Sequence, residues 1–277
     1  PTSSFFLLAN GMGCLCLSPL LFFYGSSLNH FPKSVWQLIF FTGLFQAIYM
    51  WGLASAYRHG SISVAYPLLR ALPVLFVALL ATVLKHGAAL TSFGLCGIIV
   101  ITIGCILIPI QSFRQTKLAT FFNKSCLFAL ISATGTVGYT LIDNKALLTL
   151  RGIEEVELTV AAISLLYLFL ESLSCTLWLL LIVLPNSSSR QELMLNISQN
   201  FMTAATTGIA MSLTYALVLA SMAFVENVSY VIAFRQLSIP IAVILGIYLL
   251  KEHASIAKFV GTITIFGGII LISIGSI

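Results

Sequence analysis

Residues 215–272 read YALVLASMAFVENVSYVIAFRQLSIPIAVILGIYLLKEHASIAKFVGTITIFGGIILI, and residues 49–108 carry a divergent copy of the same pattern. The identical residues keep their order: Tyr49, Leu53, Ala54, Ser55, Ser63, Val77, Leu79, Leu84 and Lys85 align with Tyr215, Leu219, Ala220, Ser221, Ser229, Val243, Leu245, Leu250 and Lys251. After a short deletion in the second copy, Gly97 and Gly104 align with Gly261 and Gly268. Collinear order and paired glycines favour a duplication over chance matches between apolar segments. Internal repeats are common in membrane transporters, whose substrate site lies between the two halves.

The composition is that of an integral membrane protein. Of the 277 residues, 59% are hydrophobic and only 8% are charged, whereas a soluble domain averages about 25% charged residues. Apolar runs recur along the whole chain, and each is long enough to cross a hydrocarbon core of about 30 Å as a helix. We therefore predict an all-α membrane protein.

Several other functions find no support in the sequence. The net charge of +5 comes from basic residues in short loops between spans, as in most membrane proteins, so no nucleic-acid partner is expected. The six cysteines fall in apolar runs and are expected to be free thiols rather than disulfides or metal ligands. Neither a Gly-Lys-Ser/Thr phosphate loop nor a His-Glu-x-x-His motif is present, so we expect no cofactor, no metal and no enzymatic activity.

The apolar runs predict nine spans. They cover residues 3–24, 35–57, 62–84, 91–110, 124–148, 157–184, 199–220, 228–250 and 256–277. Spans two to four match spans seven to nine, and a displacement by an odd number of helices inverts one copy relative to the other. The expected fold is an inverted repeat within a single membrane domain, with residues 1–110 as the N-terminal half and 124–277 as the C-terminal half. The partner of span five would precede Pro1, giving five-helix halves and ten helices.

The passage from Ala220 to Gly268 resembles the repeat of EamA-type carriers in the drug/metabolite transporter superfamily. The shared features are a polar break before a span, Pro240 within it, the Leu-Leu-Lys-Glu end at 249–252 and a last helix with glycines. The first copy is less similar, with Lys85-His86 where the family usually has an acidic residue. The resemblance implies ten helices and a central cavity that opens alternately to either side.

Two arginines lie in the middle of predicted spans, where a charge costs roughly 2.5–3.5 kcal/mol and usually faces a cavity or a partner. Arg70 shares a helical face with Ser63, Tyr66 and Pro73, and Arg235 precedes Ser238 and Pro240 in the equivalent span. Prolines leave backbone carbonyl groups free, so Pro67, Pro73 and Pro240 are expected to let these spans bend. The arginines can form a site for a carboxylate or phosphate. Alternatively, each is tied to a carboxylate such as Glu171 or to free carbonyl groups.

Two carboxylic acids also lie within predicted spans. Burial favours the neutral form of a carboxyl group, which makes Glu171 a candidate for proton coupling. The alternative for Glu171 is a permanent ion pair with Arg70 or Arg235. Asp143 is expected near the end of its span, in a solvated pair with Lys145.

Tyr49 and Tyr215 occupy matching places in the two copies, and Gln46 lies one turn before Tyr49. Matched aromatic residues at a repeat interface can stack on a substrate, or they can simply pack. We include these three residues among the candidate substrate contacts. The repeated glycines are expected to allow close helix contact.

These observations predict a secondary active transporter that moves a small polar metabolite, of the amino acid or organic acid type, by alternating access. Export across the cell membrane is expected (the inner membrane in a bacterium), with the bilayer and a small-molecule substrate as partners. Proton coupling is possible, and the protein is expected to be a monomer or a weak dimer. One alternative keeps the fold but changes the cargo: a nucleotide-sugar or sugar-phosphate exchanger, or a drug exporter. A second alternative is a channel or membrane scaffold without coupled transport.

Overall fold

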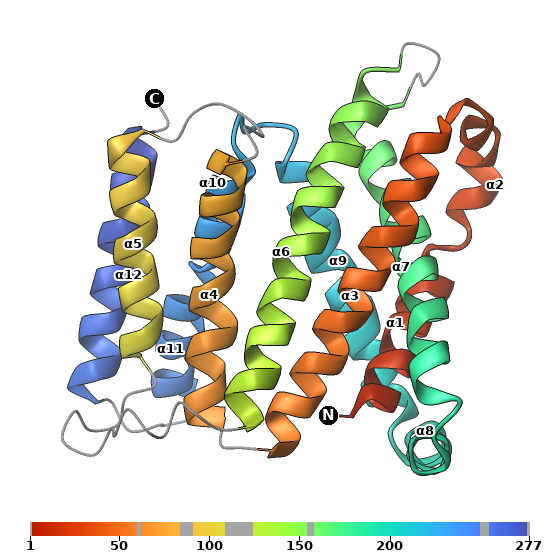
Figure 1. Ribbon diagram of the computed structural model, residues 1–277. Coiled ribbons are helices and arrows are strands. Elements are labelled where there is room, and N and C mark those ends of the chain that lie inside the picture. Colours follow the sequence, from red (N-terminus) through yellow and green to blue (C-terminus); the bar gives the residue numbers. More distant parts are fainter. Residues whose placement is uncertain are drawn as a thin grey trace. The chain divides into compact units, whose positions relative to one another are not determined.

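Helices make up nearly all of the described chain, and no strand occurs within it. The computed structural model describes residues 2–59, 62–83, 91–108, 124–153, 158–249 and 255–275, without the side chains of 62–68, 81, 82, 242 and 246. The elements, labelled in Figure 1, are α1 (Ser3–Leu17), α2 (Leu20–Tyr24), the 3-10 helix η1 (Gly25–His30), α3 (Lys33–His59), α4 (Ile62–Val83), α5 (Ser92–Leu107), α6 (Lys124–Arg151), α7 (Val160–Val183), α8 (Ser187–Gln199), α9 (Phe201–Ser221), α10 (Val228–Arg235), α11 (Ser238–Leu249) and α12 (Ile256–Gly275).

Six helices begin after a residue whose side chain accepts a hydrogen bond from the first turn. These residues are Thr2, Thr91 and Thr159 for α1, α5 and α7, Asn186 and Asn227 for α8 and α10, and Ser255 for α12. The first N–H groups of a helix have no partner within the helix, and such an N-cap contributes typically about 1 kcal/mol. The polar residues at the ends of the apolar runs therefore set where these helices start.

Two helical stretches are broken near a proline. The chain bends by 45° between α1 and the helical segment that follows Pro19. α10 ends at Arg235 and α11 begins at Ser238, and the N–H groups of Gln236 and Leu237 each bond three residues back, at 3.0 Å. Pro240, in the first turn of α11, has no N–H to donate to the carbonyl oxygen of Gln236. α4, in contrast, continues through Pro67 and Pro73.

Within the described residues, six helices are long and apolar enough to cross a membrane: α3, α6, α7, α9, the α10–α11 stretch and α12. The α1–α2 segment makes a seventh if the bent pair is one span. Two apolar helices are shorter: the part of α4 from Leu69 to Leu80, and the 16-residue helix α5. The protein is therefore an all-α, multi-pass membrane protein, as the composition predicts.

One predicted break is a helix. The spans predicted from the sequence, 157–184 and 199–220, leave a connection between them, but α8 occupies Ser187–Gln199 and contacts α1 and α9. The Ser4 hydroxyl donates to the carbonyl oxygen of Ser189 at 2.7 Å. No residue of α8 is buried, and its apolar residues, Leu193, Met194, Leu195 and Ile197, are too few for the sequence to indicate a membrane span. In Figure 1 α8 is seen nearly end-on, across the end of the α7 and α1 helices.

The helices group into two compact units, and each unit combines two parts of the chain. The first unit is Pro1–Ser55 with Gly138–Phe224, and the second is Ala56–Val137 with Val225–Ile277. Two unit boundaries fall inside α3 and α6, and the third falls between α9 and α10. These units are defined by spatial contacts, so they differ from the N-terminal and C-terminal halves that the duplication predicts. The division into halves stays a prediction.

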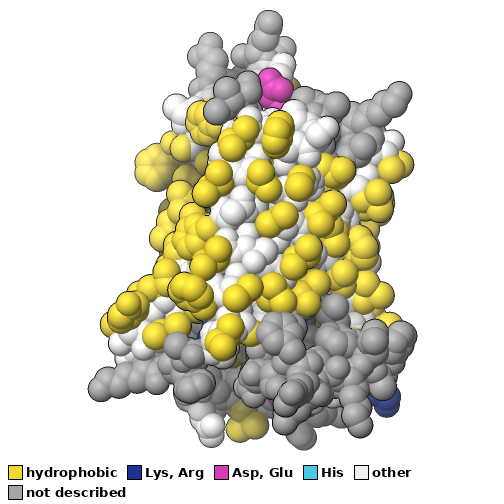
Figure 2. Space-filling view, turned by 90° about the vertical axis from the view of Figure 1, so that its left-hand side faces the viewer, with side chains coloured by type: hydrophobic (Ala, Val, Ile, Leu, Met, Phe, Trp, Pro, Cys, Tyr) yellow, Lys and Arg dark blue, Asp and Glu magenta, His cyan; other side chains and the backbone are white. Residues whose placement is uncertain are grey.

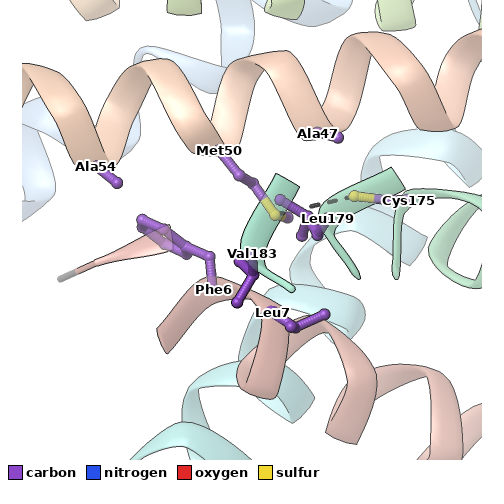
Figure 3. Packing of buried hydrophobic residues seen from close by; sticks show 8 residues of the cluster. All are labelled: Phe6, Leu7, Ala47, Met50, Ala54, Cys175, Leu179 and Val183. Atoms are coloured by element: carbon purple, nitrogen blue, oxygen red, sulfur yellow. Dashed lines mark hydrogen bonds between the residues drawn. The ribbon is translucent and has the colours of Figure 1, made fainter. Parts of the chain in front are cut away.

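The core of the first unit is formed where α1, α3 and α7 meet. Figure 3 shows the buried cluster, which consists of Phe6, Leu7, Ala47, Met50, Ala54, Cys175, Leu179 and Val183. The sulfur atoms of Met50 and Cys175 lie 4.0 Å apart. Small residues let the helices approach closely: a Cβ on Gly13 would lie 2.9 Å from the carbonyl oxygen of Gly208 in α9.

In the second unit α5 packs along α12 through glycines. A Cβ on Gly97 would lie 2.6 Å from the carbonyl oxygen of Gly268, and a Cβ on Gly104 would lie 2.9 Å from that of Gly261. The outer faces of both helices carry exposed apolar side chains, including Phe93, Ile99 and Ile103 on α5 and Phe259, Ile263 and Ile270 on α12. Figure 2 shows this side of the molecule, where the described side chains are predominantly hydrophobic. Such a face suits contact with lipid acyl chains.

Candidate functional site

A cluster of buried polar side chains lies inside the first unit, with Asp143 of α6 as its most connected member. The Asp143 side chain is completely buried. Its Oδ1 accepts hydrogen bonds from Thr42 of α3 at 2.5 Å and from the Tyr167 hydroxyl of α7 at 2.8 Å, and its Oδ2 accepts one from the Tyr215 hydroxyl of α9 at 2.5 Å. One carboxyl group therefore joins four helices.

The expectation that Asp143 forms a solvated pair with Lys145 near a helix end is wrong. Lys145 is exposed, whereas the Asp143 side chain is fully enclosed. α6 continues to Arg151, so Asp143 lies well inside the helix. Residues two apart on a helix point in different directions, which takes Lys145 away from the cluster. Asp143 is the principal member of the cluster that is missing from the predicted site residues.

Glu171 of α7, the predicted proton-coupling residue, is the second buried carboxylic acid in the cluster. Its Oε1 accepts a 2.7 Å hydrogen bond from Nε2 of Gln46 in α3. The Glu171 side chain is fully buried, and that of Gln46 is 7% exposed. Two oxygen atoms of this pair, Glu171 Oε2 and Gln46 Oε1, have no hydrogen-bond partner. Buried polar atoms without a partner are uncommon in folded proteins, so the pair is incomplete by itself.

Helical spacing explains how these side chains come together. Thr42, Gln46 and Tyr49 lie at i, i+4 and i+7 on one face of α3, and Tyr167 and Glu171 lie one turn apart on α7. Gly43 then lets α3 approach α7, because a Cβ on Gly43 would lie 2.8 Å from the backbone nitrogen of Cys175. The close contact brings the polar face of α3 against that of α7.

Three tyrosine rings extend the cluster. Tyr139 of α6 makes edge-to-face contacts with Tyr49, at a centroid distance of 5.8 Å, and with Tyr215, at 5.7 Å. The predicted candidates Tyr49 and Tyr215 thus contact a common ring, and Tyr215 also bonds to Asp143. Edge-to-face pairs of this kind contribute about 0.5–1.5 kcal/mol each. Stacking on a substrate stays a prediction for both residues.

The remaining predicted site residues belong to the second unit. Arg70 and Arg235 are half-buried, and α4 and α10, which carry them, are in contact. Ser238 is exposed and its hydroxyl donates to the carbonyl oxygen of Arg235 at 2.8 Å. Pro73 and Pro240 are buried. Ser63, Tyr66 and Pro67 lie in α4, but their side chains fall outside the described residues.

Ser229 and Gln236 of the second unit are buried, each has an oxygen atom without a hydrogen-bond partner, and neither was a predicted site residue. Ser229 begins the first turn of α10 and Gln236 follows its last residue, at exposed fractions of 0% and 4%. Ser229 Oγ and Gln236 Oε1 have no hydrogen-bond partner. The seven-residue spacing, which places both on one helical face, is the sequence signal that could have found them.

The described residues contain no group of three or more His, Cys, Asp or Glu side chains that could hold a metal ion. The six cysteines are free thiols, four of them buried. What the cluster offers chemically is hydrogen-bond acceptors, two carboxyl groups and aromatic faces, enclosed within membrane-spanning helices.

Comparison with known proteins shows the fold but no activity. No protein-family model matches the chain, and no curated protein matches it. Among solved structures 24 chains match. One, described only as the crystal structure of a protein, aligns over 100% of this chain and 88% of its own, with a TM-score of 0.68 and 14% sequence identity. At that identity the likeness carries the fold alone.

Proposed function

We propose that this protein is a secondary active transporter that moves a small polar metabolite of the amino acid type by alternating access, coupled to protons through Glu171. The observation that carries the proposal is the Gln46–Glu171 pair. A carboxyl group buried in a membrane-spanning helix is costly and usually functional. An oxygen of that group without a partner can take up and release a proton or contact a substrate.

An inverted repeat is part of the proposal, and the packing of α5 on α12 supports it. In the sequence alignment Gly97 matches Gly261, Gly104 matches Gly268, and Ile108 matches Ile272. Gly97 packs on Gly268 and Ile272, while Gly261 packs on Gly104 and Ile108. Each contact therefore recurs with the two copies exchanged, the pattern of a twofold interface between equivalent segments. Nine or ten spans and EamA-type membership belong to the same proposal.

Amino acids suit the first unit better than simple organic acids do. The unpartnered oxygens of Gln46 and Glu171 accept hydrogen bonds, and an amino acid offers a donor whereas a carboxylate alone offers none. A carboxylate would instead use the predicted arginines of the second unit, Arg70 and Arg235. We assign the protein to the cell membrane with export as its direction, without cofactor or enzymatic activity.

The test is flux in proteoliposomes that contain an internal pH dye, challenged with pools of amino acids, organic acids and sugar phosphates. We expect a saturable pH change with an amino acid pool. Labelled-substrate exchange without a pH change would contradict the coupling and favour an exchanger. Conductance without saturation would contradict the carrier and favour a channel.

A further inference from the structure

The Gln46–Glu171 pair presents two hydrogen-bond acceptors that lack donors. Nε2 of Gln46 is already used by Glu171 Oε1, which leaves Gln46 Oε1 and Glu171 Oε2 without partners. Both side chains are more than nine-tenths buried, so bulk water does not satisfy these atoms. The group that completes the pair must therefore bring donors of its own.

The chemistry of the two atoms selects a positively charged donor. An ammonium group offers three N–H donors and a charge opposite to that of a carboxylate. A hydroxyl group offers a single donor and no charge. Carboxylates bring only acceptors, and both carboxylates and phosphates carry negative charge, which the carboxyl groups of the cluster would repel.

The surroundings of the Gln46–Glu171 pair add charge and aromatic faces. Both oxygens of Asp143 are occupied by hydroxyl donors, so this carboxyl group contributes charge rather than a free contact. Tyr139 lies between Tyr49 and Tyr215, and tyrosine faces attract cations within about 6 Å. Four basic side chains of this unit are exposed: His30, Lys33, Lys145 and Arg190. Arg151, two turns beyond Asp143 at the end of α6, donates through Nη2 to the carbonyl oxygen of Leu219, and its Nε and Nη1 have no hydrogen-bond partner.

We infer that Gln46 and Glu171 bind the ammonium group of a small organic amine, which donates hydrogen bonds to Glu171 Oε2 and Gln46 Oε1. The tyrosine trio and Asp143 favour the positive charge. The amine site is inferred independently of transport. The further claim that the bound amine is also the transported molecule rests on the proposed function.

The test is calorimetric titration of the purified full chain in detergent with three molecules of similar size: 2-phenylethylamine, 2-phenylethanol and 3-phenylpropionate. We expect saturable binding of the amine and at least tenfold weaker binding of the alcohol and the acid. Glu171→Gln and Gln46→Leu should each weaken amine binding at least tenfold. Glu192→Gln, which changes a carboxyl group of α8, should leave it unchanged. Equal binding of amine and alcohol, or full binding by Glu171→Gln, would overturn the inference.

A second measurement uses the unsubstituted protein, in case a variant fails to fold. Dicyclohexylcarbodiimide labels carboxyl groups in apolar surroundings, and peptide mass spectrometry locates the label. The amine should reduce labelling of Glu171 at least fivefold while the alcohol does not. Undiminished labelling at saturating amine would contradict the site.

Measuring both amine binding and transport tests the amine site and the carrier function separately. Amine binding without flux would leave the site standing and remove the carrier. Saturable flux of another substrate, without amine binding, would remove the site and leave the carrier.

Discussion

Gly97 of α5 and Gly268 of α12 pack backbone against backbone. A Cβ on Gly97 would lie 2.6 Å from the carbonyl oxygen of Gly268, and a Cβ on Gly268 would lie 2.8 Å from that of Gly97. Gly104 and Gly261 repeat the arrangement at 2.9 Å in both directions. Because side-chain burial gives little advantage over lipid contact, membrane helices associate through such close approach of small residues. The glycines therefore hold the α5–α12 pair together.

Gly97→Ala is expected to destabilise the protein by about 1–3 kcal/mol, the usual cost of overpacking. Its methyl group would meet a backbone oxygen and Ile272, and a backbone cannot rotate away as a flexible side chain can. The measurement is the unfolding free energy in detergent titrated with a denaturing surfactant. Gly267→Ala is the matched control, because a Cβ there has no atom within 4 Å. Equal stability of the two variants would show that the α5–α12 contact is loose.

Removing the Tyr215 hydroxyl should cost more stability than removing the Tyr167 hydroxyl. The Tyr215 hydroxyl donates to Asp143 Oδ2. Asp143 Oδ1 accepts from both Thr42 and Tyr167, so it keeps the hydrogen bond from Thr42 when the Tyr167 hydroxyl is removed. A buried acceptor left without a donor costs about 1–3 kcal/mol. Surfactant-titrated unfolding of Tyr215→Phe and Tyr167→Phe compares the two. Tyr248→Phe, at a position that is 79% exposed, should be neutral, and a larger loss from Tyr167→Phe would refute the order.

Amine affinity is expected to weaken as the pH falls, by up to tenfold per pH unit. A proton on Glu171 and a bound ammonium compete for one carboxylate, so protonation at low pH removes the site. The titratable groups on the surrounding helices are Cys14 of α1, Tyr49 of α3, Asp143 and Tyr139 of α6, Tyr167 and Cys175 of α7 and Tyr215 of α9. Amine-binding titrations from pH 5 to 9 measure how steeply the affinity changes with pH. Asp143 lies in the same cluster, so the pH dependence that remains in Glu171→Gln reports its contribution. The full pH dependence in that variant would assign the competition to another group.

Much of the fold follows from the sequence because membrane helices are defined by length and apolar composition. Every predicted span contains a helix, and Asn186 and Asn227, which cap α8 and α10, lie between predicted spans. The predicted glycines face each other in α5 and α12, as their role in close helix contact requires. α8 was missed because its sequence is too polar for a membrane span, and its position depends on contacts with α1 and α9.

The site was predicted only in part, because its geometry depends on contacts far apart in the chain. Gln46 and Glu171 were both candidates, but they are 125 residues apart and nothing local pairs them. Asp143 was misjudged since its environment comes from donors on three other helices. The spacing of Thr42, Gln46 and Tyr49 is the one local signal of the polar face of α3.

Replacing Arg70 or Arg235 by alanine should abolish transport while leaving the protein folded. A carboxylate-bearing substrate would lose a bidentate, charge-assisted contact, which contributes about 1.5–3 kcal/mol and therefore an affinity loss of at least tenfold. Flux of the amino acid pool in proteoliposomes measures the effect, and Lys145→Ala at an exposed position is the control. Amine binding by the isolated protein should persist in both arginine variants, because Gln46 and Glu171 belong to the other unit. Unchanged flux in both variants would exclude an anion site at these arginines, and loss of amine binding would mean that the two sites are not independent.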